Sequence, residues 1–186
     1  MKYTPKQALE KLVTGNETYR TAHTNPGDIS PARRRETALH GQHPYAVVLT
    51  CSDSRVPPEH IFSAGLGELF VVRTAGNVVG AFELGTIEYG VEHLHAPLIL
   101  VMGHTQCGAV AAALEGHAEG YIECVVKEIQ QGFCCPSGET EAVVENILHS
   151  KCKIMGSEIV RRLIGAGQLD IACALYDTAT GRVDFL

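Results

Sequence analysis

The chain reads AVVLTCSDSR over residues 46–55, an apolar run that ends in a short polar turn. An unbroken apolar run of this length is typical of a strand that is buried on both faces of a sheet. The runs LFVV at 69–72 and LILVM at 98–102 have the same character. We therefore expect three strands of one buried sheet, each bounded by turn residues.

Helical patterns separate and follow these strands. Residues 82–94 carry one pattern between the second and third runs, and the alanine-rich segment 108–114 carries another after the third. Strand and helix in alternation predict a parallel sheet joined by right-handed crossovers. The sequence thus predicts an α/β fold, with a mostly parallel central sheet of about four to five strands flanked by helices.

The flanking segments complete this prediction. Thr4 and Pro5 are an N-cap and a proline at the first helical position, which predicts a helix that begins there. The other expected elements are the body of that helix up to about Arg20, a loop over 23–31, one or two helices over 139–164 that would break near Gly156, and a closing hairpin of 169–176 and 182–186. Residues 116–138 give no clear pattern, and Cys134-Cys135-Pro136 interrupts any helix there.

Composition excludes several classes of protein. The net charge of −6 argues against a nucleic-acid partner or an acidic membrane surface, since both need clustered Lys and Arg. No apolar run approaches the length of a membrane span, and the N-terminus has no secretory signal pattern, so we expect a cytoplasmic protein. In a reducing compartment, the seven cysteines indicate metal binding, catalysis or burial rather than disulfides.

Three residues suit one metal ion. Cys51 ends the first predicted strand, and His104 and Cys107 follow the third. The carboxyl ends of neighbouring strands in an open α/β sheet converge, which is where ligands bind. Two thiolates and one imidazole favour Zn²⁺, and three protein ligands leave a fourth position open, as in catalytic sites. Two alternatives stay open: a cysteine buried as a small apolar residue, and a structural site closed by Asp53 or another cysteine.

A carboxylate and a guanidinium lie close to the first of these ligands. Asp53 can bind the metal itself or accept a hydrogen bond from metal-bound water, and Arg55 can hold it in a two-pronged ion pair. An ordinary surface ion pair is the alternative. The other cysteines lack paired spacing and are interpreted as structural or incidental; they are Cys124, Cys134, Cys135, Cys152 and Cys173.

The segments CSDSR at 51–55 and GHTQCGAV at 103–110 resemble the two zinc-binding motifs of the β-class carbonic anhydrases. The resemblance extends over GELFVVRTAGN at 67–77, IEYGVEHL at 87–94 and ALYDTATGRVDFL at 174–186. It implies zinc ligation by Cys51, His104 and Cys107, a catalytic dyad of Asp53 and Arg55, and a backbone donor to bicarbonate at Gly108. It also implies a four-stranded parallel core and an N-terminal helical arm that grips a second subunit, in a homodimer or homotetramer.

The activity implied is that of a lyase, the reversible hydration of carbon dioxide to bicarbonate by zinc-bound hydroxide. Hydrolysis of carbonyl sulfide or carbon disulfide at the same site, and a non-catalytic zinc sensor of bicarbonate closed by Asp53, are the alternatives. We expect one domain over 1–186, with a helical arm at 1–40, a zinc-binding core at 45–115, and C-terminal helices and closing strands at 116–186.

Two departures from the family pattern affect the pocket. Some relatives carry a glutamine where this chain has Ala64-Gly65-Leu66, and the tryptophan of a regulatory bicarbonate site is missing because the chain has no tryptophan. We expect apolar pocket walls from Val56, Val72 and Val78.

Overall fold

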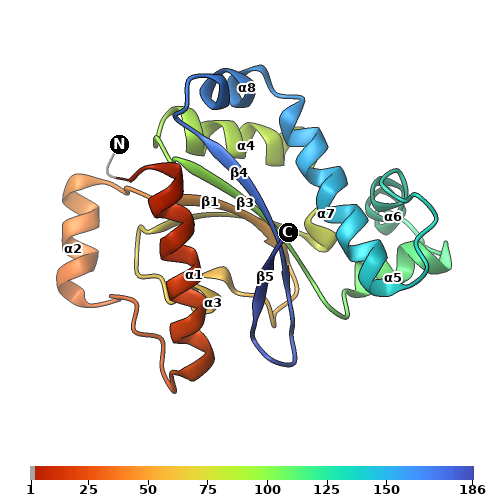
Figure 1. Cartoon of the computed structure of the whole chain (residues 1–186), viewed down its shortest axis with the longest axis horizontal. Helices are drawn as coiled ribbons and strands as arrows, with labels where there is room; N and C mark the ends of the chain where they lie inside the picture. Colours follow the sequence, from red (N-terminus) through yellow and green to blue (C-terminus); the bar gives the residue numbers. More distant parts are fainter. Residues whose placement is uncertain (1–2) are drawn as a thin grey trace.

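The computed structural model describes residues 3–186. These residues form a five-stranded sheet in the order β2-β1-β3-β4-β5 (Figure 1). The first four strands in this order pair in parallel and the last pairs antiparallel with its neighbour. The strands are β1 (Ala46–Cys51), β2 (Leu69–Thr74), β3 (Leu98–His104), β4 (Asp170–Tyr176) and β5 (Val183–Phe185). The predicted α/β class and closing hairpin are confirmed.

The helices include those that the sequence predicted, together with short ones over Pro58–Ile61, Ala75–Asn77 and Ile122–Gln130, to which it assigned no helix. They are α1 (Pro5–Thr21), α2 (Pro31–His40), α3 (Pro58–Ile61), the 3₁₀ turn η1 (Ala75–Asn77), α4 (Ala81–Glu92), α5 (Gly108–Glu115), α6 (Ile122–Gln130), α7 (Glu139–Met155) and α8 (Glu158–Gly165). The region 139–164 forms two helices, with the break at Gly156. Helix α6 lies in the segment for which the sequence made no assignment.

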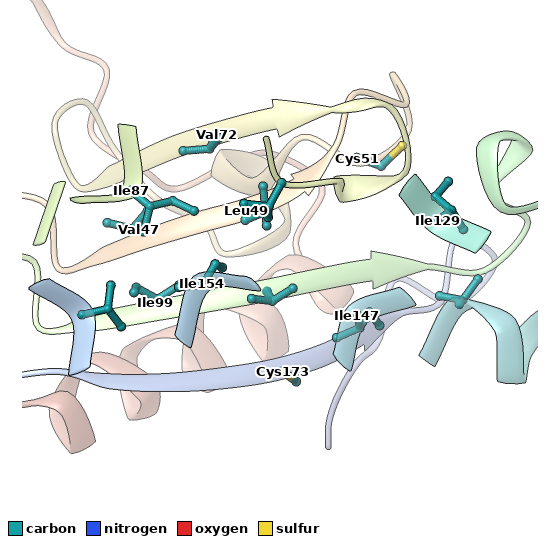
Figure 2. Close-up of a cluster of buried hydrophobic side chains, with 14 of the residues drawn as sticks. Val47, Leu49, Cys51, Val72, Ile87, Ile99, Ile129, Ile147, Ile154 and Cys173 are labelled. Atoms are coloured by element: carbon teal, nitrogen blue, oxygen red, sulfur yellow. The ribbon is translucent and has the colours of Figure 1, made fainter. Parts of the chain in front are cut away.

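The two faces of the sheet pack against different helices. Along β1, alternate side chains point to opposite faces, so that Val47 and Leu49 belong to one buried cluster while Ala46 and Val48 belong to the other. Helices α4, α6 and α7 contribute Ile87, Ile129 and Ile147 to the first cluster, and Figure 2 shows these side chains over the strands, with Cys51 at the carboxyl end of β1. Helix α1 covers the second face with Ala8 and Leu12.

The N-terminal segment is a pair of helices with different roles. Thr4 caps α1 by accepting a hydrogen bond from the Gln7 N–H, as the sequence predicts. Helix α1 buries its apolar face on the sheet, whereas α2 buries none of its residues. Only the second helix therefore stands away from the core as an arm (Figure 1). In residues 3–186, no helix combines the length and the apolar character that a membrane span needs.

Strand β2 corrects one expectation. The run at 69–72 was expected to be buried on both faces, but only Val72 of these four residues is buried. The reason is its position, because β2 is the edge strand of the sheet and has β1 as its only neighbouring strand among the described residues. Strands β1 and β3 lie inside the sheet and are fully buried, as expected.

Candidate active site

Three metal-binding side chains meet at the carboxyl edge of the sheet. Cys51 is the last residue of β1 and His104 the last of β3, and these two strands pair in parallel, so their ends lie side by side. Cys107 follows as the N-cap of α5. The ligand atoms of the three buried residues all lie within 4.8 Å of one another. Within residues 3–186 this is the one such group of His, Cys, Asp and Glu side chains.

The donor set fits a tetrahedral metal ion. The two sulfur atoms of Cys51 and Cys107 are 4.0 Å apart, close to the edge of about 3.8 Å that zinc–sulfur bonds of about 2.3 Å would give. His104 donates its Nδ1–H to the Thr105 carbonyl at 2.9 Å, which leaves a lone pair on Nε2. That Nε2 is buried and has no hydrogen-bond partner in the described part of the chain. A metal ion would satisfy this otherwise costly buried atom.

The thiols of Cys51 and Cys107 are in contact and can release their protons to a metal. This contact lowers the pKa of Cys51 to about 4. The same contact, together with burial, raises the pKa of Cys107. Two backbone groups, the N–H of Asp53 at 3.4 Å and that of Gly76 at 3.3 Å, also donate to the Cys51 sulfur. A divalent cation in place of the protons would leave both sulfurs as thiolates.

Asp53 and Arg55 form the ion pair that the sequence suggested. The Asp53 carboxylate accepts hydrogen bonds from Arg55 N at 2.9 Å, Nε at 3.0 Å and Nη2 at 2.7 Å. These bonds hold the pKa of Asp53 down at about 2, so the carboxylate is ionised. Asp53 Oδ2 also lies 4.0 Å from His104 Nε2. Arg55 therefore holds the Asp53 carboxylate in place beside the three metal-binding side chains.

Backbone groups that sequence reasoning missed complete the site. The Gln106 carbonyl accepts from Arg55 Nη2 at 3.0 Å and so fixes the guanidinium. Arg73 donates to the carbonyls of Cys51 at 3.0 Å and Asp53 at 2.6 Å, which ties the end of β1 to β2. Arg73 stands in the matched segment 67–77, but the partners it binds are main-chain atoms and have no signature in a sequence.

The remaining predicted site residues are Gly108 and the three valines that were expected to form pocket walls. Gly108 is exposed at the first position of α5, with open space where a side chain would be. Val72 and Val78 lie on the same side of the sheet as Cys51. Val56 was expected to form a pocket wall, but it is fully buried in the cluster on the opposite face and offers no surface to a pocket.

The other five cysteines lie outside this site. Cys173 is buried in β4, and burial raises the pKa of its thiol. The remaining four are exposed and are Cys124, Cys134, Cys135 and Cys152. All five are free thiols in the structure.

Comparison with known sequences shows close relatives over nearly the whole chain. A family model described as carbonic anhydrase matches residues 46–183. Carbonic anhydrase 2 of Mycobacterium tuberculosis is 35% identical, over 96% of this chain and 91% of that protein. The carbonic anhydrase of Mycolicibacterium smegmatis is 40% identical, over 97% of this chain and 92% of its own length.

Solved structures give the same result. The β-carbonic anhydrase CcaA superposes with a TM-score of 0.74 and 27% identity, over 96% of this chain and 91% of that one. A tetrameric β-carbonic anhydrase of Sordaria macrospora superposes with a TM-score of 0.75 and 25% identity, over 93% and 90%. Sequence and fold agree, and the chain belongs to the β-class carbonic anhydrase family and is a carbonic anhydrase.

Proposed function

We propose that this enzyme hydrates carbon dioxide reversibly with a zinc ion held by Cys51, His104 and Cys107. The observation that carries the proposal is the buried, unpartnered Nε2 of His104, which faces two thiols within 4.8 Å. Two sulfurs and one imidazole suit Zn²⁺, and three ligands leave room for substrate chemistry. When bound, zinc lowers the pKa of water so that hydroxide is available near neutral pH.

In this proposal Asp53 orients the attacking water. Its carboxylate is ionised and lies beside the ligand group, so it can accept a hydrogen bond from that water and turn an oxygen lone pair toward carbon dioxide. Arg55 keeps Asp53 in this role by binding both of its oxygens. Without Arg55, the carboxylate would be free to turn to the metal and take the position that water needs.

Gly108 supports the product in the proposed reaction. Its backbone N–H is at the first turn of α5, where helix N–H groups lack partners inside the helix and the dipole favours an anion. The absence of a side chain leaves the approach open, since an added Cβ would contact nothing within 4 Å. Bicarbonate, which is anionic, would gain from this donor, whereas carbon dioxide is neutral and would not.

The geometry favours an open catalytic site over a closed sensor. A closed site needs Asp53 as the fourth metal ligand, but in the structure three donors of Arg55 hold that carboxylate and Gln106 holds Arg55 in turn. The salt bridge would have to break before the site could close. The open site is therefore the form on which the proposed function rests.

We further propose that the enzyme works as a homodimer or homotetramer. Strand β2 is a half-buried edge of the sheet, and Phe82 at the start of α4 is 87% exposed. Large apolar side chains and open strand edges of this kind are usual where a second chain packs. The Sordaria macrospora relative is described as tetrameric.

Substrate assays on protein of known zinc content test the function. We expect rapid stopped-flow hydration of carbon dioxide at about one zinc per chain, and little hydrolysis of carbonyl sulfide. Asp53→Asn should lower kcat/KM by about a hundredfold or more. Asp184→Asn is the matched control, because Asp184 is also paired with an arginine but lies on the hairpin strand β5. Fast turnover of carbonyl sulfide without hydration of carbon dioxide would contradict the proposal and favour a carbonyl sulfide hydrolase.

A further inference from the structure

We infer that Asn146 is a positioning residue for the metal ligand Cys51 and acts on it through the backbone of Gly76. The inference rests on the zinc site proposed above. Asn146 lies on α7 and is 1% exposed. Its Nδ2 donates to the Gly76 carbonyl at 2.7 Å, and the Gly76 N–H donates to the Cys51 sulfur at 3.3 Å. One helix on the face of the sheet thus reaches the ligand in two hydrogen bonds.

The backbone of Gly76 needs to be held in place, because rotation about its φ and ψ changes the direction of its N–H relative to its carbonyl. Gly76 has φ 64° and ψ 23°, a left-handed conformation that glycine adopts easily and leaves easily. A larger residue is disfavoured, because the positive φ strains any residue with a Cβ and that Cβ would lie 2.7 Å from Ile129 Cδ1 and 3.2 Å from Ala109 Cβ. Ile129 and Cys51 both lie at this end of the sheet in Figure 2. The residue that donates to Cys51 is therefore a flexible glycine, and the hydrogen bond from Asn146 restrains its backbone.

The hydrogen bonding of Asn146 indicates that its donor group, Nδ2, is the reason for an asparagine at this position. Its Nδ2 is bonded, whereas its Oδ1 is buried without a hydrogen-bond partner among residues 3–186. An unpaired buried amide oxygen destabilises the fold, so an apolar residue of similar size would pack here at less cost. An apolar residue could not donate to the Gly76 carbonyl. The Gly76 N–H would then no longer be held in the direction of the Cys51 sulfur.

The expected effect is on metal binding. An N–H donor to a thiolate fixes the direction of the sulfur lone pairs and stabilises its negative charge in a buried site. Partners of metal ligands typically change metal affinity by about 10–100-fold when removed. Asn146 is one hydrogen bond further from the metal than such partners are. We therefore expect its loss to lower zinc affinity by an amount near the lower end of that range.

Ser150 supplies a matched control. It lies one turn further along α7, is also 1% exposed, and its hydroxyl donates to the Asn77 carbonyl at 2.9 Å. The two side chains thus hold neighbouring residues of the same turn η1. They differ in that Gly76 binds the Cys51 sulfur and no bond from Asn77 to a metal ligand is among the hydrogen bonds of residues 3–186.

The experiment compares Asn146→Ala, Asn146→Asp and Ser150→Ala with the wild type. Asn146→Asp keeps the shape but replaces the donating NH2 with an acceptor. The measurements are zinc affinity by chelator competition, the cobalt–thiolate charge-transfer band of cobalt-loaded protein, and thermal unfolding of the metal-free chain. We expect both Asn146 variants to weaken zinc binding by about tenfold and to shift the cobalt band. Ser150→Ala should lower the unfolding temperature and leave both metal readouts unchanged.

A measurement on the wild type protects the test if the Asn146 variants do not fold. In cadmium-113-loaded protein, a scalar coupling between the metal and the Gly76 amide proton is expected through the N–H···S bond. Equal zinc affinities and cobalt bands in all folded variants, or no such coupling at Gly76, would overturn the inference and leave the proposed function intact. A wild-type chain that binds no zinc, cobalt or cadmium would overturn both.

Discussion

At the scale of single residues, the site depends on which group binds the Asp53 carboxylate. Its carboxylate lies beside the ligand group but is bound at both oxygens by Arg55, and Arg55 is bound in turn by the Gln106 carbonyl. This arrangement separates two chemical outcomes, because a restrained carboxylate orients water and a released one can take the metal. Arg55 therefore matters more than its half-exposed position suggests.

Replacing Arg55 tests this reading. Arg55→Ala should lower kcat/KM by about a hundredfold, since even a small misplacement of Asp53 affects the reacting geometry. Arg182→Ala is the control, because Arg182 also pairs with an aspartate two residues away and is similarly exposed. An exposed pair of that kind contributes about 0–1 kcal/mol to stability, and its loss should leave stopped-flow rates unchanged. Equal rates in the two variants would contradict the role given to Arg55.

The sequence predicted the side chains of the site but not the main-chain groups that orient them. Cys51, His104 and Cys107 were predicted because they follow two buried strands and stand in segments that resemble known zinc-binding motifs. The carbonyl of Thr105 and the N–H of Gly76 were not, because every residue except proline carries both groups. Their roles follow only from where the folded backbone places them.

At the scale of elements, close packing places the site. Helix α4 crosses β1 and β2 at Gly90, where an added Cβ would lie 2.7 Å from Val47 Cγ2 and 2.9 Å from Phe70 Cδ1. The helix axis can therefore approach the sheet closely, and the turn η1, which precedes α4, contacts β1. A small residue at this crossing sets the distance between the two layers.

Two glycines of the same helix test the crossing. Gly90→Ala should destabilise the protein by about 1–3 kcal/mol, because the added methyl overpacks the contact with β1 and β2. Gly85→Ala is the matched control, since a Cβ there contacts nothing within 4 Å, and it should stabilise the helix by about 0.5–1 kcal/mol. Urea unfolding measures both. A stabilising Gly90→Ala would show that α4 does not need this close approach.

Sequence periodicity predicted strands and long helices better than short ones. The runs at 46–50 and 98–102 matched β1 and β3, because fully buried strands have an unbroken apolar sequence. Helix α6 was missed although Ile122, Val125, Val126 and Ile129 recur at helical spacing. The pattern is only nine residues long and lies between glycines and the Cys134-Cys135-Pro136 break, which hid it.

At the scale of the whole molecule, exposed apolar residues support the proposed homo-oligomer. Helix α2 buries none of its residues in this chain, and Leu39 on it is 78% exposed. Strand β2 is only half buried although its sequence suits full burial. No pattern in a single sequence distinguishes apolar residues that face the chain's own core from those that face a second copy. The mismatch between sequence and burial at β2 is what a homo-oligomer would resolve.

A charge on the arm tests the assembly. Leu39→Glu should leave the monomer fold intact, because α2 contributes nothing to the core, and should shift the protein to a smaller mass in light scattering after gel filtration. Gln131→Glu is the control, because Gln131 is an exposed polar residue at the C-cap of α6, and α6 lies on the other side of the molecule from α2 (Figure 1). We expect no change in its mass. A wild type that is already monomeric would contradict the proposed assembly.

The most direct measurement is the rate of carbon dioxide hydration against zinc content, with zinc removed by a chelator and added back in steps. We predict that the metal-free chain is inactive and that the rate rises in proportion to zinc, levelling at about one ion per chain. A metal-free chain that keeps its rate, or a fully loaded chain no faster than buffer, would contradict the assignment of catalysis to Cys51, His104 and Cys107.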